Sequence, residues 1–209
     1  MKNTPRKFLS KVKAGLRNLL APRLQRILNV LEPNTRSLPV SKKTSETSKC
    51  RASLAPYCLG DGIDIGFGGD PIVPHAICMD MFQAYAQYET HVQHLHGDAK
   101  DLHWFQDNSL DFIYSSHVLE DFHDTRAILD EWLRVLKPGG NLVLYLPDEQ
   151  TYRDYCRSQG KPPNSHHVHE HFSLLHVKNA ISHRNDLEII HEKFPVGIYS
   201  FELVLQKAK

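Results

Sequence analysis

The distribution of apolar and polar residues divides the chain into a helical leader and a longer part in which short apolar runs alternate with amphipathic stretches. In residues 1–31, apolar side chains recur every three or four positions, which is typical of an amphipathic helix, and Pro22 interrupts or restarts it. Residues 33–49 are rich in Pro and Ser and predict a flexible linker. We therefore expect a leader and linker over residues 1–50 and a folded domain over residues 51–209.

The folded domain carries strand and helix signals in alternation. Short apolar runs predict strands at 62–65, 76–79, 92–96, 110–114, 142–146, 187–194 and 199–205. Amphipathic stretches predict helices at 82–88, 150–157 and 173–181. A further helix is expected to start at the capping residue Asp124 and to end before residues 137–140, whose sequence is KPGG.

This alternation predicts an α/β fold with a doubly wound, mostly parallel, Rossmann-like sheet of seven strands. The last two strands are separated by residues 195–197, which are too few for a helical crossover, so we expect an antiparallel C-terminal hairpin. Only about seven residues separate Gly68 from the second strand, whereas a parallel crossover usually needs about a dozen. The first crossover helix is therefore expected to be reduced to a turn or lost.

Composition and charge exclude several classes of protein. The chain has 41% hydrophobic and 23% charged residues, close to globular averages, and no apolar run approaches the length of about 18 residues that spans a membrane. Its four cysteines show no paired spacing, which argues against a disulfide framework or a Cys-ligated zinc site and favours a reducing cytoplasm. We expect a cytoplasmic protein.

Charge is divided unevenly between the leader and the domain. Residues 1–51 hold 13 of the 25 Lys and Arg residues but only two of the 24 acidic residues. The leader is therefore suited to an anionic membrane surface or another acidic partner, so the protein could be peripheral to the membrane through residues 1–31. Two alternatives stay open: a helix that packs on the domain, and an organellar transit peptide. The scattered aromatic residues form no stacking platform, so no nucleic-acid partner is expected.

Small and acidic residues follow the first three predicted strands. Gly66 and Gly68 come after the first strand, and Asp80 and Asp98 end the second and third. In an open α/β sheet, ligands bind beyond the carboxyl ends of the strands, where glycines let the backbone approach a ligand and a carboxylate can bind a ribose diol. The pattern favours a ligand that contains adenosine.

Five segments, taken in order, resemble class I S-adenosylmethionine-dependent methyltransferases, with a type 11-like methyltransferase domain. They are residues 62–69 (GIDIGFGG), Asp80, 97–99 (GDA), 110–120 (LDFIYSSHVLE) and 131–140 (EWLRVLKPGG). The resemblance implies S-adenosylmethionine as cofactor, bound by Asp64, Gly66, Gly68, Asp80, Met81, Asp98, Ala99 and Ser115. The chain departs from the family pattern at Asp70, which replaces the third glycine, and at Asp121, where many relatives carry a histidine.

Catalytic and substrate-binding candidates come from the histidines. His117 follows the fourth strand, where acceptors lie in this family, and is our candidate for the base that receives the acceptor's proton. Glu120, Asp121 and His123 are secondary candidates. His169 and His171, in the histidine-rich segment 166–171, are expected to contact substrate. No residue that would orient metal-binding histidines can be identified from the sequence, so no metal site is expected.

The sequence therefore predicts methyl transfer from S-adenosylmethionine to an unidentified acceptor, which could be a small molecule, a lipid-linked molecule or a glycan. The alternative is a binding or scaffold protein that retains the methyltransferase fold without catalysis. A nicotinamide-dependent oxidoreductase shares the glycine loop and Asp80, but the order of the later motifs and the closing hairpin disfavour it.

Overall fold

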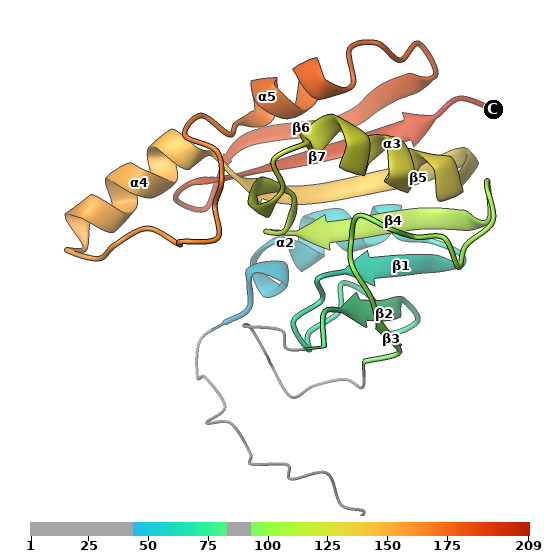
Figure 1. Ribbon diagram of the computed structural model, residues 1–209, viewed down its shortest axis with the longest axis horizontal. Coiled ribbons are helices and arrows are strands. Elements are labelled where there is room, and N and C mark those ends of the chain that lie inside the picture. Colours follow the sequence, from blue (N-terminus) through green and yellow to red (C-terminus); the bar gives the residue numbers. More distant parts are fainter. Residues whose placement is uncertain (1–43, 83–92) are drawn as a thin grey trace, which may run out of the picture. The chain divides into compact units, whose positions relative to one another are not determined.

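The computed structural model describes residues 44–82 and 93–209 (Figure 1). The described strands are β1 (Gly62–Ile65), β2 (Ile77–Asp80), β3 (Leu95–His96), β4 (Leu110–Ser116), β5 (Leu136–Pro147), β6 (Leu187–Val196) and β7 (Ser200–Lys207). The described α-helices are α2 (Glu46–Leu54), α3 (Thr125–Val135), α4 (Glu149–Ser158) and α5 (Leu174–Ala180). Short 3₁₀ helices occupy Ala55–Tyr57 and Leu119–Asp121. Among these elements, no helix is long and apolar enough to cross a membrane.

The seven strands form one sheet in the order β3-β2-β1-β4-β5-β7-β6. Strands β1 to β5 pair in parallel, and β7 pairs antiparallel with both β5 and β6. The predicted doubly wound α/β sheet with an antiparallel C-terminal hairpin is confirmed. Chain order reverses between β1 and β4, and this is the point at which such sheets bind ligands.

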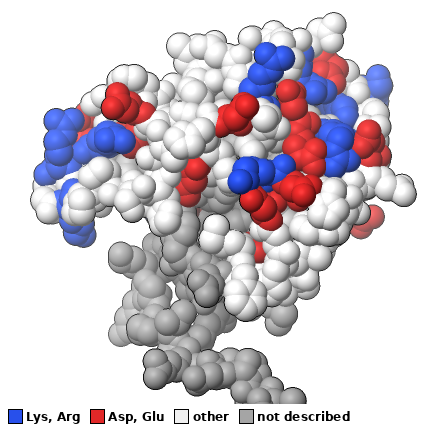
Figure 2. All heavy atoms as spheres, in the orientation of Figure 1, with Lys and Arg blue, Asp and Glu red and all other residues white. Residues whose placement is uncertain are grey.

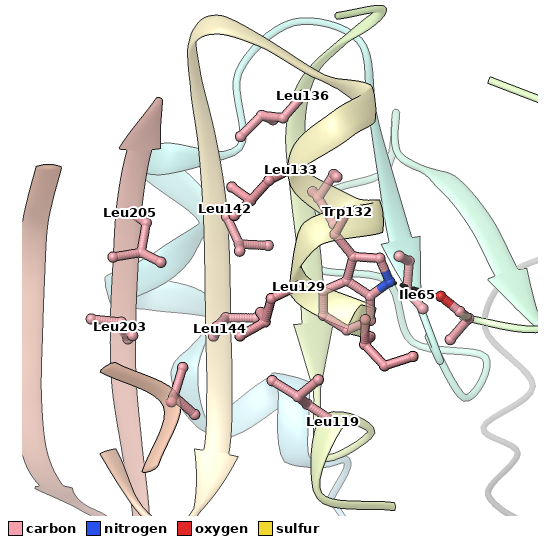
Figure 3. Packing of buried hydrophobic residues seen from close by; sticks show 14 of the residues in the cluster. Ile65, Leu119, Leu129, Trp132, Leu133, Leu136, Leu142, Leu144, Leu203 and Leu205 are labelled. Carbon is pink, nitrogen blue, oxygen red and sulfur yellow. Dashed lines mark hydrogen bonds between the residues drawn. The ribbon is translucent and has the colours of Figure 1, made fainter. Parts of the chain in front are cut away.

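Helices cover both faces of the sheet, α3 and α5 on one and α2 on the other (Figure 1). On the first face, Leu129 and Leu133 of α3 lie over leucines of β5, and the Trp132 ring points toward Ile65 of β1 (Figure 3). On the second face, Cys50 and Leu54 of α2 pack against aromatic side chains of β4. Successive residues of β4 point to opposite faces, so this strand contributes to both clusters.

Several element predictions are confirmed. Asp124 caps α3 by accepting a hydrogen bond from the Ala127 N–H at 2.9 Å, and Ser173 caps α5 in the same way. Residues 66–76 contain no helix between β1 and β2, as the short spacing predicts. The strand predicted at 142–146 begins earlier, at Leu136, because Gly140 brings the chain so close to the Asp111 carbonyl that a Cβ would lie 2.8 Å from it.

The linker prediction is wrong over residues 46–49. Helix α2 begins at Glu46, because the Ser45 hydroxyl accepts a hydrogen bond from the Ser48 N–H at 3.0 Å and because Cys50 and Leu54 bury an apolar edge. The polar composition of this segment hid a helix that tertiary contacts stabilise. The leader over residues 1–31 and the helix predicted at 82–88, apart from Phe82, lie outside the described residues.

Charges on the face seen in Figure 2 are mixed, with basic side chains beside acidic ones. Among the described residues, Arg134 forms ion pairs with Asp107 at 2.6 Å and with Glu131 at 2.8 Å.

Candidate functional site

A cavity of about 940 Å³ opens at the carboxyl ends of β1, β2 and β4. Its walls come from the turns that follow these strands, from the first residue of α2, and from residues 164–168. The cavity lies at the switch point of the sheet, where chain order reverses between β1 and β4. Strand topology therefore explains why segments from so much of the chain meet here. The volume suits a ligand of the size that such pockets commonly hold.

The glycine turn after β1 forms one wall. Gly66 has φ +72°, and a Cβ on it would collide with the side chain of Val118. Only glycine satisfies both the left-handed backbone and this close approach. Gly68, with φ +60°, donates its N–H to Asp80 Oδ2 at 3.1 Å.

Asp80, at the end of β2, is fixed by two backbone N–H groups. Its second oxygen, Oδ1, accepts from the Met81 N–H at 2.8 Å. Burial raises the pKa of Asp80, while the hydrogen bonds from Gly68 and Met81 oppose that rise. The neighbouring Met81 and Phe82 are 52% and 79% exposed and both line the cavity, so apolar side chains are available to a ligand here.

The loop after β3 forms the next part of the wall. Asp98 and Ala99 both line the cavity, as predicted. The Ala99 carbonyl accepts a hydrogen bond from Trp132 Nε1 of α3 at 2.8 Å, and Asp98 Oδ1 accepts from the Lys100 N–H at 3.0 Å. The packing of α3 therefore fixes the backbone that faces a ligand.

Two of the predicted cofactor-binding residues, Asp64 and Ser115, do not line the cavity. The cavity lies beyond the strand ends, so Ile65 and Ser116, the last residues of β1 and β4, line it, while Asp64 and Ser115 lie one residue further inside the sheet. Asp64 accepts a hydrogen bond from the Ile72 N–H at 2.7 Å, and the Ser115 hydroxyl donates to the Ile65 carbonyl at 3.1 Å. Both residues hold the glycine turn in place.

Burial raises the pKa of Asp64 to about 8. The carboxyl group is 1% exposed, and its Oδ1 has no hydrogen-bond partner among the described residues. The favoured form of this side chain at neutral pH is therefore the protonated one.

His117 lines the far side of the cavity, as the sequence predicts. It adopts a left-handed backbone conformation, with φ +54°, and its N–H donates to the Tyr145 carbonyl at 3.0 Å. Its Nε2 lies 3.2 Å from the Ser200 hydroxyl and 3.5 Å from Glu46 Oε2. Burial lowers the pKa of His117, but the nearby Glu120 and Glu46 carboxylates outweigh burial and raise it.

A chain of ionisable side chains adjoins His117. Glu120 Oε1 lies 3.4 Å from His117 Nδ1 and 3.6 Å from His167 Nε2. His167 Nδ1 in turn lies 2.7 Å from Glu149 Oε2, and Arg153 Nε donates to Glu149 Oε1 at 2.7 Å. Glu120 and Glu149 are both almost completely buried.

Sequence reasoning missed Glu46, Glu149 and Tyr199 at this end of the cavity. Glu46 and Tyr199 line it, from α2 and from the turn between β6 and β7, and Glu149 lies behind it at the start of α4. No motif spacing connects residues this far apart in the chain. Only the acidic first turns of α2 and α4 could have drawn attention to Glu46 and Glu149.

His169 and His171, predicted to contact substrate, do not line the cavity. His169 Nε2 lies 2.7 Å from the Phe122 carbonyl, and its ring packs against Phe172 and His176. His171 is exposed. The chain turns at residues 164–167. As a result, His167 lines the cavity, whereas His169 and His171 do not.

The sheet order, the antiparallel last pair of strands and the cavity at the switch point define an α/β protein with the class I methyltransferase architecture. Residues 72–144 match a family model described as a methyltransferase domain. The match covers part of the domain, and solved structures share the fold of most of the chain.

Solved structures share the fold. A protein from Pyrococcus horikoshii superposes with a TM-score of 0.62 and 18% identity, over 82% of this chain and 97% of that one. A protein from Thermotoga maritima, described as an S-adenosylmethionine-dependent methyltransferase and possible histamine N-methyltransferase, superposes with a TM-score of 0.57 and 20% identity, over 79% of this chain and 88% of that one.

A demethylmenaquinone methyltransferase from Clavibacter sepedonicus is 47% identical over 53 residues, which are 25% of this chain and 21% of that protein. The matched segment of a second curated relative covers 10% of its length. This chain therefore aligns with about a fifth or less of these curated relatives.

Proposed function

We propose that this protein transfers a methyl group from S-adenosylmethionine to an acceptor bound beside His117. The observation that carries the proposal is the single cavity that joins Gly66, Gly68 and Asp80 at one end to His117 at the other. Its position at the switch point of a methyltransferase-type sheet supports the same reaction.

The cavity wall at the glycine end fits S-adenosylmethionine. The backbone at Gly66 leaves no room for a side chain, and Asp80 presents a carboxylate that two N–H groups hold in place. In the proposal, Asp80 accepts hydrogen bonds from the ribose hydroxyls. Met81 and Phe82 contact the adenine ring, and Asp98 and Ala99 face its edge.

At the other end of the cavity, the protein's task is to hold the acceptor and to receive a proton. When bound, S-adenosylmethionine supplies a methyl group on a positively charged sulfur. The acceptor atom forms a bond to the methyl carbon while the carbon–sulfur bond breaks, and the electron pair of that bond stays on sulfur. His117 receives the proton of a hydroxyl acceptor, and Tyr152 and Tyr199 close the wall around it.

Titration calorimetry tests the cofactor. We expect S-adenosylmethionine and S-adenosylhomocysteine to bind, and NADH, as the control ligand, not to bind. Asp80→Ala removes the proposed ribose contact and is expected to weaken binding about 10- to 100-fold, the range of one or two hydrogen bonds to a charged group. The matched control is Asp107→Ala, an exposed aspartate outside the cavity that should leave binding unchanged.

One observation favours the scaffold alternative. The Gly68 N–H, which would be available to a ligand, is occupied by Asp80, and no helix follows the glycine turn before β2. A folded sample that binds neither S-adenosylmethionine nor S-adenosylhomocysteine would overturn the proposed function and support this alternative. Binding without turnover on any small-molecule, lipid-linked or glycan acceptor would support a scaffold that retains the cofactor.

A further inference from the structure

Glu120 is a buried carboxylate that lacks the partners such a group needs. Its side chain is 1% exposed, and neither oxygen has a hydrogen-bond partner among the residues that the structure describes. A buried charge is stable only when it is paired and hydrogen-bonded or when it coordinates a metal ion. The nearest basic groups are the two imidazoles at 3.4 and 3.6 Å, which are too far for good hydrogen bonds.

His167 is oriented toward Glu120 by a carboxylate behind it. The Nδ1–H of His167 donates to Glu149 Oε2 at 2.7 Å, which points the other ring nitrogen, Nε2, at Glu120. Arg153 holds the other oxygen of Glu149. A histidine that donates one ring N–H to a carboxylate and presents the other nitrogen is the usual arrangement of a metal ligand.

Asp121 completes a cluster of three ligand atoms. One oxygen of Glu120, one oxygen of Asp121 and one ring nitrogen of His167 all lie within 4.8 Å of one another. Bonds of about 2.2 Å to one ion allow ligand atoms to lie up to about 4.4 Å apart, so a contraction of a few tenths of an ångström brings them into range.

We propose that Glu120, Asp121 and His167 bind a divalent transition-metal ion at the acceptor end of the cavity. All three line the cavity, so the ion keeps open positions toward it. Two carboxylates and one imidazole suit Mn²⁺, Fe²⁺ or Zn²⁺ rather than a soft ion that requires thiolates. Glu149 and Arg153, which orient His167, belong to α4 and not to the segment 166–171. The fold therefore provides the orienting residues that the sequence of this segment lacks.

The site also deepens the proposed function, on which this step rests. An ion bound here can hold a hydroxyl oxygen of the acceptor in an open position and lower its pKa, so that the proton leaves more easily to His117. The acceptor class that fits is therefore an alcohol or phenol, and methylation would occur on oxygen.

Metal binding can be measured on the full chain without any acceptor. Protein dialysed against EDTA is titrated with Mn²⁺, followed by electron paramagnetic resonance, and with Zn²⁺, followed by calorimetry. We expect one ion per chain. Glu120→Gln and His167→Ala should each weaken binding at least 10-fold, and Glu149→Gln, which touches the metal only through His167, should weaken it about 10- to 100-fold.

Two residues of the same loop provide matched controls. Glu170→Gln and His171→Ala replace exposed side chains outside the cavity and should leave metal affinity unchanged. Circular dichroism and binding of S-adenosylhomocysteine report whether each variant is folded.

Other outcomes would overturn the metal site. One is no binding of Mn²⁺ or Zn²⁺ at millimolar concentration by a protein that still binds S-adenosylhomocysteine, which leaves the proposed cofactor standing. Another is metal binding that persists unchanged in both Glu120→Gln and His167→Ala. Metal binding without any S-adenosylhomocysteine binding would instead support the site and contradict the proposed cofactor.

Discussion

At the scale of single residues, burial decides which acidic side chains carry chemistry. Asp64 and Asp80 belong to the adjacent strands β1 and β2, yet Asp80 lines the cavity and Asp64 is buried. Asp64 pairs with Cys78, two residues before Asp80, so both acids point to the same face of the sheet. The difference arises because Asp80 is the last residue of β2, whereas Asp64 lies inside β1. Asp64 therefore holds the glycine turn in place, and the stability of the fold depends on whether this carboxyl group is protonated.

The raised pKa of Asp64 makes stability depend on pH. The pKa of Asp64 is about 8 in the folded state, against the ordinary value of 3.8 expected in the unfolded state. The folded state therefore binds this proton more tightly, and the free energy of unfolding falls as the pH rises from 3.8 to about 8. Asp64→Asn keeps an acceptor for the Ile72 N–H and cannot ionise. We expect urea denaturation to show the Asn variant gaining stability relative to the parent between pH 5 and pH 8, by at most on the order of 5 kcal/mol.

The exposed residue Asp107 provides the control for this titration. Asp107→Asn should show no comparable change in relative stability over the same pH range, because its side chain is 68% exposed. Parallel pH profiles for Asp64→Asn and the parent protein would contradict the assignment of a buried, protonated Asp64.

At the scale of elements, helix α3 links the core to the cavity. Trp132 is fully buried in the core, and its Nε1–H reaches the carbonyl of Ala99, which lines the cavity. The packing of Trp132 in the core therefore fixes the position of a loop that lines the cavity. Helix α2 has a similar role on the other face, where Ser45 caps it and Glu46 enters the cavity wall.

Trp132→Phe keeps an aromatic ring but removes the donor to Ala99. The buried carbonyl then lacks its partner, and we expect the free energy of unfolding to fall by about 1–3 kcal/mol. Affinity for S-adenosylhomocysteine should fall as well, because the loop after β3 loses its anchor. Arg126→Ala, on the exposed side of α3, should change stability by no more than about 0.5 kcal/mol and leave affinity unchanged. An equal loss of affinity in both variants would contradict the link.

At the scale of the whole molecule, the leader differs from the rest of the chain in its charge. Residues 1–31 contain eight Lys and Arg residues and no acidic residue. Such a segment gains about 1 kcal/mol for each basic residue near an anionic surface at low salt. We propose that it brings the domain to anionic membranes, where a lipid-linked acceptor would be found.

Vesicle flotation tests this proposal. The full chain should float with vesicles that contain anionic phosphatidylserine and should stay in the soluble fraction with neutral phosphatidylcholine vesicles. A chain that lacks residues 1–31 should stay in the soluble fraction with both. Absence of flotation by the full chain, or equal flotation of both chains, would remove the basis for a lipid-linked acceptor.

The amino-acid sequence by itself determined most of the elements, helix α2 excepted, and the meeting of Gly66 and Asp80 at one end of the cavity. Local patterns report local structure, so the Asp124 cap, the closing hairpin and the loss of the first crossover helix could all be predicted from spacing. Gly66 and Asp80 could be placed together because parallel strands present their carboxyl ends at one edge of the sheet.

Only the tertiary structure decided which residues gather around His117 at the other end of the cavity. Glu120, Glu149 and His167 come from three separate segments, and no periodicity connects residues brought together by long-range packing. The structure also decided that Asp64 and Ser115 turn away from the cavity and that His169 packs against α5, because the direction of a side chain depends on strand register and on turns between elements. The residues around His117 are therefore brought together by long-range contacts, which local sequence patterns do not report.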